Sequence, residues 1–492
     1  MQDEELEELK AKLICCNCVG EAFLSDEIKR DGKRATCSYC GNDRKSYSID
    51  EMAERIDAVF SEHFVRTSDQ PDSWEQTMLS DRESDYEWER AGEPVLWAIA
   101  GAADIPEDAA QDILSLLEDQ YSDFDSQKIG EETEFDSESY YEEKGTDDRQ
   151  WQESWRDFEK VLRTEARFFS RTAEQHLASV FEDIDKLNAT DGRPLVTDAG
   201  PGTAYVSLYR ARVFQSDHRL ERALAQLDSQ LGSPPSSDAL AGRMNARGIS
   251  VFYGANDPNV ALAEIRPPVG SQVVIGRFDI VRPLRLLDLT ALSDVHPAGS
   301  VFDPKHASAL ERAMFLRSLS ERITKPIMPD DEAFDYLTTQ AIADFLATTF
   351  ARPLDGIIYP SVQSPGTALN IVLFHKAARV RESDLPKGTE VSVSLGQNGE
   401  DGWETDYRII ERTPPPPPKA GVSQHKGHAG PPNLRELIQS PIDWDEMNFD
   451  SREPTLSLDI DSVNVHRVES VTFVAPPQKV SHFRWEKRDL DF

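Results

Sequence analysis

The sequence predicts a multidomain α+β protein, and three features of the chain support this fold class. All five cysteines lie between Cys15 and Cys40. Apolar residues then recur at helical spacing from residue 48 to about residue 188. At Thr203 the pattern changes to short stretches of β-branched and aromatic residues, which indicate strands. We therefore expect four regions: a metal-binding segment at 1–48, a mostly helical domain at 49–195, an α+β domain at 196–385, and a Pro-rich linker with closing strands at 386–492.

Composition and charge restrict the functions that we expect. The chain has 492 residues, and its 39% hydrophobic and 29% charged content is typical of a soluble globular protein. The formal net charge is −36, with most of the acidic excess in residues 1–150. Because such a surface repels phosphate backbones, nucleic acid is not an expected partner. The sequence has neither an apolar run near the ~18 residues of a membrane span nor a secretory signal. We therefore expect a cytoplasmic protein with no membrane partner.

The cysteine spacing predicts a zinc ribbon at the N-terminus. Cys15 and Cys18 form one short pair and Cys37 and Cys40 form another, which matches the spacing of four-thiolate zinc sites. Cys16 is the spare thiol. Because so short a segment lacks a core of its own, we expect the zinc to be structural. The alternative is free thiols or disulfides, although a cytosolic chain stays reduced.

The regions after the zinc ribbon differ in their periodicity. Helical spacing is found in three stretches, at 56–64, 113–117 and 151–181. The acidic stretch 119–150 indicates a loop or a solvated face. Strands are expected at 204–214, 251–253, 272–280, 284–289, 356–360 and 369–374, and helices at 308–319 and 331–349. A linker is expected at 414–432, followed by two closing strands at 456–460 and 468–474.

Three residues of the α+β region are suited to cleaving a glycosidic C–N bond. Arg243 precedes Tyr253, and Glu264 follows it, at intervals of ten and eleven residues. Guanidinium groups anchor a pyrophosphate, and an aromatic ring provides a face on which a planar base can stack. A carboxylate stabilises the positive charge that develops on the ribose. Each residue also has an ordinary structural alternative, as a salt-bridge arginine, a core tyrosine or a surface glutamate.

The region from about 203 to 377 resembles the RES domain family in five ordered blocks. The blocks are Leu208-Tyr-Arg210-Ala-Arg212, Gly242-Arg243-Met244-Asn245 with Gly248, Val251-Phe-Tyr253 through Ala261 and Glu264, Tyr336 through Gln340 to Phe345, and Asp355 through Ser361 on to Asn370 and Phe374. The second block has Met244 where the family normally has Trp, a change that we expect to alter packing more than chemistry.

This resemblance implies an ADP-ribosyltransferase-like fold and an activity on NAD. RES proteins include toxins that degrade NAD by phosphorolysis or hydrolysis, and members that transfer ADP-ribose to a protein. The expected small-molecule partners are NAD, as substrate, and inorganic phosphate. A role as a toxin or bacterial defence effector is expected, with an antitoxin or another regulatory protein as a possible macromolecular partner.

The resemblance also implies the residues of the NAD site. Arg210 and Arg243 would bind the phosphates and ribose, and Tyr253 would stack on nicotinamide. Glu264 would bind the nicotinamide ribose and stabilise its positive charge. Ser361 would position the nicotinamide end. The implied catalytic set is thus Glu264, Arg243, Tyr253 and Ser361, and the implied NAD-binding set is Arg210, Arg243, Tyr253, Ser361 and Asn370. Asn370 and Gln340 have a second interpretation, in which they hold loops.

The helical region resembles, more loosely, the HEPN-type domain found before some RES domains. HEPN ribonucleases carry an Arg and a His on one helix, and Arg171 and His176 have a compatible spacing. RNA cleavage by this region is therefore an alternative function. The other interpretations are a scaffold or regulatory domain without chemistry of its own, and a non-catalytic zinc-containing interaction protein.

Overall fold

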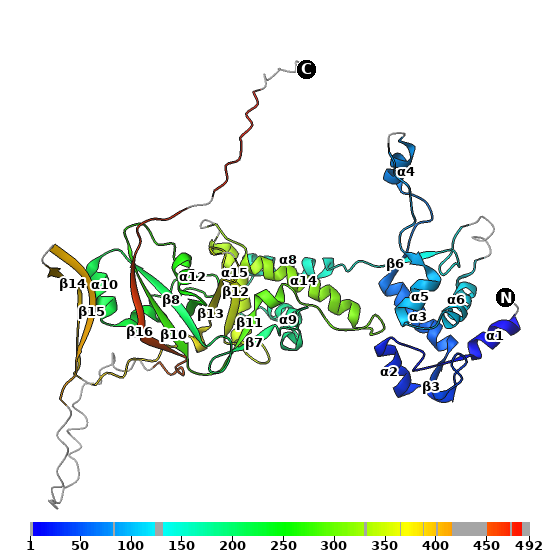
Figure 1. The fold of residues 1–492 in the computed structure, drawn as a ribbon, viewed down its shortest axis with the longest axis horizontal. Helices are drawn as coiled ribbons and strands as arrows, with labels where there is room; N and C mark the ends of the chain where they lie inside the picture. Colours follow the sequence, from blue (N-terminus) through cyan, green and yellow to red (C-terminus); the bar gives the residue numbers. More distant parts are fainter. Residues whose placement is uncertain are drawn as a thin grey trace, which may run out of the picture. The chain divides into compact units, whose positions relative to one another are not determined.

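The computed structural model separates into two compact units (Figure 1). The residues that it describes are 3–81, 84–123, 131–328, 332–364, 366–386, 388–399, 402–415, 450–472 and 475–484. Unit 1 comprises 1–195 and 291–323, and unit 2 comprises 196–290 and 324–492. Both helices and strands are well represented, in agreement with the predicted α+β class. None of the described helices is both long and apolar enough to cross a membrane.

Unit 1 begins with a small antiparallel sheet flanked by short helices. Its elements are α1 (Asp3–Ala11), β1 (Leu13–Cys15), α2 (Ala22–Asp31), β2 (Lys33–Thr36) and β3 (Asp43–Ser48), with strand order β1-β3-β2. Ile14, Leu24 and Ile28 are fully buried and share one apolar core with residues of the following helices. From its length, the N-terminal segment was expected to lack a core of its own. Its apolar residues instead form part of the larger core of unit 1.

The rest of unit 1 is mostly helical. The helices are α3 (Ile49–His63), α4 (Ser73–Ser80), α5 (Val95–Ala103), α6 (Glu107–Tyr121), α8 (Arg149–Thr164), α9 (Arg171–Val180) and α14 (His306–Thr324). Ser48 and Glu51 form a capping box that fixes the start of α3. The apolar stripe Ile56, Val59 and Phe60 is buried, as its spacing predicts.

A second small sheet in unit 1 was not anticipated from the sequence. It contains β4 (Phe64–Arg66), β5 (Glu93–Pro94) and β6 (Tyr140–Glu143), in the order β4-β6-β5. β6 lies within the acidic stretch that indicated a loop. Its Tyr141 is 3% exposed and packs edge-on against Phe60. The buried Tyr141 side chain thus stabilises β6. The acidic residues around it obscure the alternation of apolar residues from which a strand is predicted.

The segment 291–323 belongs to unit 1, although the expected domain limits include it in 196–385. Its long helix, α14, carries the fully buried Phe315. The Phe315 ring lies 5.7 Å from that of Trp151 and 5.5 Å from that of Trp155, both on α8. These aromatic contacts explain why the segment joins unit 1.

Unit 2 is built around an eight-stranded sheet with the order β16-β10-β8-β9-β13-β12-β11-β7 (Figure 1). The strands are β7 (Val196–Ala199), β8 (Ser207–Phe214), β9 (Phe252–Ala255), β10 (Gln272–Ile280), β11 (Leu284–Asp288), β12 (Gly356–Pro360), β13 (Leu369–Leu373) and β16 (Leu456–Arg467). Only β11 and β12 pair in parallel. Six of these strands lie at the predicted positions, because their β-branched and aromatic residues are the buried ones.

Helices and a hairpin complete unit 2. They are α10 (Asp217–Leu224), α11 (Leu227–Leu231), α12 (Pro258–Glu264), α15 (Glu332–Thr348), β14 (Glu390–Gly399) and β15 (Gly402–Arg412). The β14–β15 hairpin was not predicted. Where two closing strands were expected, a single strand, β16, extends to Arg467, and the described residues 468–472 are not a strand. The linker segment 416–449 lies outside the described residues.

Candidate functional site

A cavity of about 320 Å³ in unit 2 brings together residues that are far apart in the sequence. The polar and aromatic residues that line it are Tyr209, Arg210, Arg243, Tyr253, Glu264, Tyr336, Tyr359 and Asn370. The four strands that contribute to it, β8, β9, β13 and β12, are consecutive in the sheet. Sheet order therefore accounts for the convergence of these stretches.

The carboxylate of Glu264 is fixed by two buried donors. Glu264 ends α12, which begins at Pro258 and is capped by Asp257. Its Oε1 accepts hydrogen bonds from Ser361 Oγ at 2.5 Å and from Asn370 Nδ2 at 2.8 Å. Ser361 is 7% exposed and Asn370 is 4% exposed, whereas Glu264 as a whole residue is exposed. The carboxylate thus lines the cavity at a solvent-accessible position while one oxygen is held by the interior.

The hydroxyl of Ser361 is committed to this carboxylate. Its Oγ accepts the backbone N–H groups of Gln363 and Ser364, each at 3.2 Å, and its own proton is donated to Glu264. Ser361 does not line the cavity among the described residues. The geometry therefore makes Ser361 a residue that positions Glu264, whereas the resemblance implied a role at the nicotinamide end.

Arg210 brings an unpaired cation to the cavity. Its guanidinium Cζ lies 4.8 Å from the ring centroid of Phe252. Its NH1 atom is buried and has no hydrogen-bond partner among the described residues. Burial, together with the positive charge of the neighbouring Arg212, lowers the pKa of Arg210 to about 10, so the group stays charged at neutral pH. A buried cation without a counter-ion is unfavourable, and an anionic ligand in the cavity would satisfy it.

Arg243 sits on a tight turn that α15 holds in place. Gly242 N donates to Asn245 O at 2.9 Å, which closes the turn. From α15, Gln340 Nε2 donates to the carbonyls of Gly242 and Asn245 at 2.9 and 3.0 Å. Thr339 Oγ1 donates to the carbonyl of Arg243 at 2.5 Å. Of the two interpretations of Gln340, the structure thus supports the one in which it holds a loop.

The hydroxyl of Tyr253 is bound to the same turn. It donates to Asn245 Oδ1 at 2.9 Å and accepts the backbone N–H of Met244 at 3.1 Å. Burial raises the pKa of Tyr253 to about 12, so the phenol is neutral at ordinary pH. The ring of Tyr253 therefore lines the cavity, whereas its hydroxyl ties β9 to the turn that carries Arg243.

Asn245 is the central member of this network. It is 4% exposed, and its Nδ2 lies within hydrogen-bond distance of three backbone carbonyls, at 2.9–3.2 Å. We expect Asn245→Ala to reduce the free energy of unfolding of unit 2 by about 2–4 kcal/mol, because it leaves several buried groups unpaired. Tyr253→Phe removes one hydroxyl and should cost about 1 kcal/mol. Thermal unfolding, with hydrogen exchange over 240–250, would measure both, and equal losses would contradict the central position of Asn245.

Comparison with protein-family models matches residues 207–395 to the RES domain. The chain contains a RES domain. Its limits enclose the entire cavity, from β8 to β13. No curated protein and no solved structure matches the chain.

The RES domain places most of the residues implied by the resemblance in one cavity. Arg210, Arg243, Tyr253, Glu264 and Asn370 line it, and Ser361 contacts it through Glu264. The sequence did not assign a role at the site to Asn245, Tyr336 or Tyr359. All three fall within the blocks that resemble the family. That resemblance was the only sequence signal for them, because their contacts depend on the folded turn and sheet.

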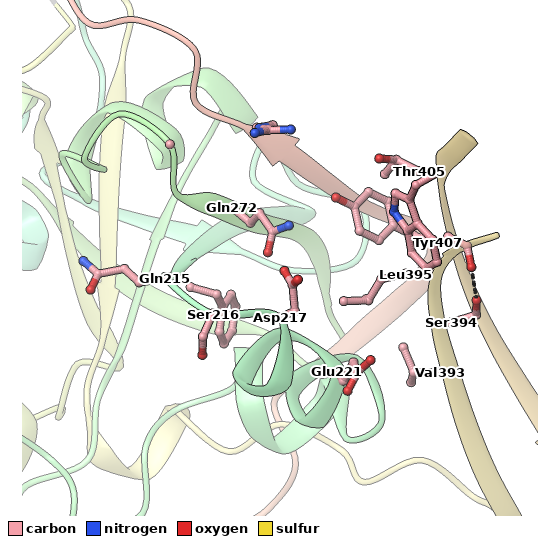
Figure 2. A pocket seen from close by; sticks show the side chains of 15 residues that line it. Gln215, Ser216, Asp217, Glu221, Gln272, Val393, Ser394, Leu395, Thr405 and Tyr407 are labelled. Atoms are coloured by element: carbon pink, nitrogen blue, oxygen red, sulfur yellow. Dashed lines mark hydrogen bonds between the residues drawn. The ribbon is translucent and has the colours of Figure 1, made fainter. Parts of the chain in front are cut away.

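A second cavity, of about 570 Å³, lies between α10 and the β14–β15 hairpin (Figure 2). Asp217 and Glu221 of α10 reach it from one side, and Tyr407 of β15 reaches it from the other. It contains none of the residues implied for NAD binding. Its lining carries two carboxylates and the guanidinium of Arg467, whereas the smaller cavity has two guanidiniums and one carboxylate. The smaller cavity is therefore the better anion site.

The four predicted metal ligands lie together in unit 1. The sulfur atoms of Cys15, Cys18, Cys37 and Cys40 are all within 4.8 Å of one another. The Cys15–Cys18, Cys15–Cys40 and Cys18–Cys37 separations are 3.7, 3.6 and 3.8 Å. A tetrahedron of sulfurs about 2.3 Å from a zinc ion has edges of about 3.8 Å, so the cluster fits zinc. Cys16 is outside the cluster and contributes to the apolar core.

Arg171 and His176, the two residues considered for RNA cleavage, have surroundings that differ from each other. Arg171 is exposed at the start of α9. The His176 ring lies 5.3 Å from that of Phe158 and 5.7 Å from that of Trp155. Burial lowers the pKa of His176, and its Nε2 has no partner among the described residues. An uncharged imidazole packed against two aromatic rings has a packing role, and this position does not favour proton transfer.

Proposed function

We propose that the RES domain cleaves the nicotinamide–ribose bond of NAD. The observation that carries this proposal is the fixed carboxylate of Glu264 in a cavity that also contains the unpaired guanidinium of Arg210. An anion-binding group and a group that stabilises positive charge are thus available to one ligand. NAD presents a pyrophosphate to the first and a developing oxocarbenium ion to the second.

The proposed mechanism assigns a role to each of these side chains. Arg210 and Arg243 bind the pyrophosphate, and the nicotinamide ring lies against Tyr253. As the C–N bond breaks, its electron pair moves to the nicotinamide nitrogen and neutralises the pyridinium charge. Glu264 stabilises the positive charge left on the ribose. Phosphate or water then bonds to the anomeric carbon, and an attacking water releases a proton. The held oxygen of Glu264 limits reorganisation during the reaction, because Ser361 and Asn370 already orient it.

Product identification tests the proposal. The purified full chain would be incubated with NAD, with and without inorganic phosphate, and the products separated by chromatography. Nicotinamide release is expected in at least one condition, with ADP-ribose as the hydrolysis product or its 1″-phosphate as the phosphorolysis product. Radiolabel carried from NAD onto a protein of a cell lysate would instead identify transfer of ADP-ribose. Intact NAD in every condition would refute the proposal.

A cellular role follows from this activity. Sustained cleavage would lower the NAD pool, which is the basis for proposing that the protein is a toxin or defence effector restrained by an antitoxin or another regulatory protein. Cellular NAD is expected to fall on expression of the wild-type chain and to remain constant on expression of Glu264→Gln. An equal fall with both chains would contradict this role.

The Arg210→Met variant is expected to weaken the binding of ADP-ribose without lowering the stability of the fold. We expect it to bind ADP-ribose about 10- to 150-fold more weakly, because a charge-assisted hydrogen bond contributes about 1.5–3 kcal/mol. Its melting temperature should be unchanged or higher, because an unpaired buried cation is removed. Calorimetry and thermal unfolding would measure the two effects. Arg212→Met is the matched control, since Arg212 donates to Gln230 and does not line the cavity.

A further inference from the structure

Tyr359 is one of the four tyrosines that line the RES-domain cavity. The residue lies on β12, directly opposite Asn370 of β13. It lines the cavity together with Arg243, Tyr253 and Glu264. Cross-strand neighbours in a sheet lie on the same face, so Tyr359 and Asn370 share the face that carries the cavity.

The phenols of Tyr253 and Tyr359 differ in their hydrogen bonding. The Tyr253 hydroxyl has two protein partners, Asn245 and Met244. The Tyr359 hydroxyl has no hydrogen-bond partner within the part of the chain that the structure describes. Tyr359 is half-buried and lines the cavity, so its unpaired hydroxyl is available to donate to water or to a ligand.

The surroundings of Tyr359 keep it a hydrogen-bond donor. Burial, with the charge of Glu264 and the nearby phenol of Tyr253, raises the pKa of Tyr359 well above its ordinary value. The phenol is therefore protonated throughout the range in which the protein would be assayed. Tyr359 lies near Glu264, because its cross-strand neighbour Asn370 donates a hydrogen bond to Glu264 Oε1.

We propose that the Tyr359 hydroxyl donates a hydrogen bond to an oxygen of the nicotinamide–ribose half of the substrate. This inference rests on the proposed function, because Glu264 then faces that same ribose. The ligand class is a nicotinamide nucleotide, mono- or dinucleotide, with an oxygen acceptor beside the Glu264 carboxylate. The adenylate half of NAD is not required for this contact.

Tyr359→Phe removes the hydroxyl and retains the ring. For nicotinamide release from NAD, kcat/KM is expected to fall about tenfold, the effect of one neutral hydrogen bond of about 1.4 kcal/mol. Calorimetric affinity for nicotinamide mononucleotide should fall by a similar factor. The melting temperature should not change, because no protein hydrogen bond is lost. Tyr253→Phe is the matched control, and it should lower the melting temperature because its hydroxyl bonds to Asn245.

The outcomes distinguish this inference from the proposed function. Unchanged kcat/KM and unchanged mononucleotide affinity in Tyr359→Phe would overturn the inference while leaving NAD cleavage intact. A loss with NAD but not with the mononucleotide would assign the hydroxyl to the adenylate half and would also overturn it. A wild-type protein that releases no nicotinamide and binds no mononucleotide would refute both.

Discussion

Glu264→Gln is expected to lower kcat for nicotinamide release about 10²- to 10³-fold, the usual effect of removing one preorganised electrostatic group from an active site. The substitution preserves shape and an oxygen acceptor for Ser361 and Asn370, so the fold should be retained. It removes the negative charge that stabilises the ribose cation. Steady-state kinetics with NAD would measure kcat, and calorimetry with ADP-ribose would show that binding is retained.

A matched control distinguishes the loss of the Glu264 charge from a general reduction in the negative charge of the chain. Glu221 on α10 is exposed and lines the other cavity, and its carboxylate has no hydrogen-bond or ion-pair partner in the described structure. Glu221→Gln makes the same change in net charge and should leave kcat at the wild-type value. Equal kcat for the wild type and Glu264→Gln would remove Glu264 from the mechanism.

Loss of the metal is expected to have the largest effect on stability. The free energy of zinc binding to four thiolates is about 10–16 kcal/mol in small zinc domains, which is comparable to the stability of an entire domain. The double variant Cys37→Ser/Cys40→Ser should bind no zinc and should lose the small sheet of β1, β2 and β3. Because Ile14, Leu24 and Ile28 contribute to the core of unit 1, the loss should extend to α3.

Metal analysis and limited proteolysis would test this expectation. The wild type should contain one zinc per chain, and the double variant none, with new cleavage sites in 1–63. Cys16→Ser should keep its zinc, because Cys16 lies outside the cluster. A zinc-free double variant with the melting temperature and proteolysis pattern of the wild type would contradict a structural role.

Some features of the fold follow directly from local patterns in the sequence, and others do not. Six strands of the RES domain and the buried stripe of α3 follow from apolar periodicity, because the same residues form the core. The cysteine spacing predicted the metal cluster, because short pairs have little conformational choice. Local patterns did not predict β6, where one buried tyrosine stabilises a strand in an acidic stretch.

The cavity was predictable only in part. Arg210, Arg243, Tyr253, Glu264 and Asn370 came from a family resemblance, and the structure brings them together. The contacts that give each side chain of the site its role were not predictable from the sequence. That Ser361 holds Glu264, and that the hydroxyl of Tyr253 is bound to Asn245, depends on sheet register and on a turn held by α15. Such contacts arise between distant segments and leave no periodic signal in the sequence.

The central claim is that one cavity of the RES domain binds NAD with its nicotinamide ribose at Glu264. A crystal structure of the full Glu264→Gln chain with NAD would test it most directly. The account predicts the pyrophosphate at Arg210, the nicotinamide ring against Tyr253, and the anomeric carbon facing residue 264. NAD bound between α10 and the β14–β15 hairpin, or density for NAD nowhere in the RES domain, would contradict it.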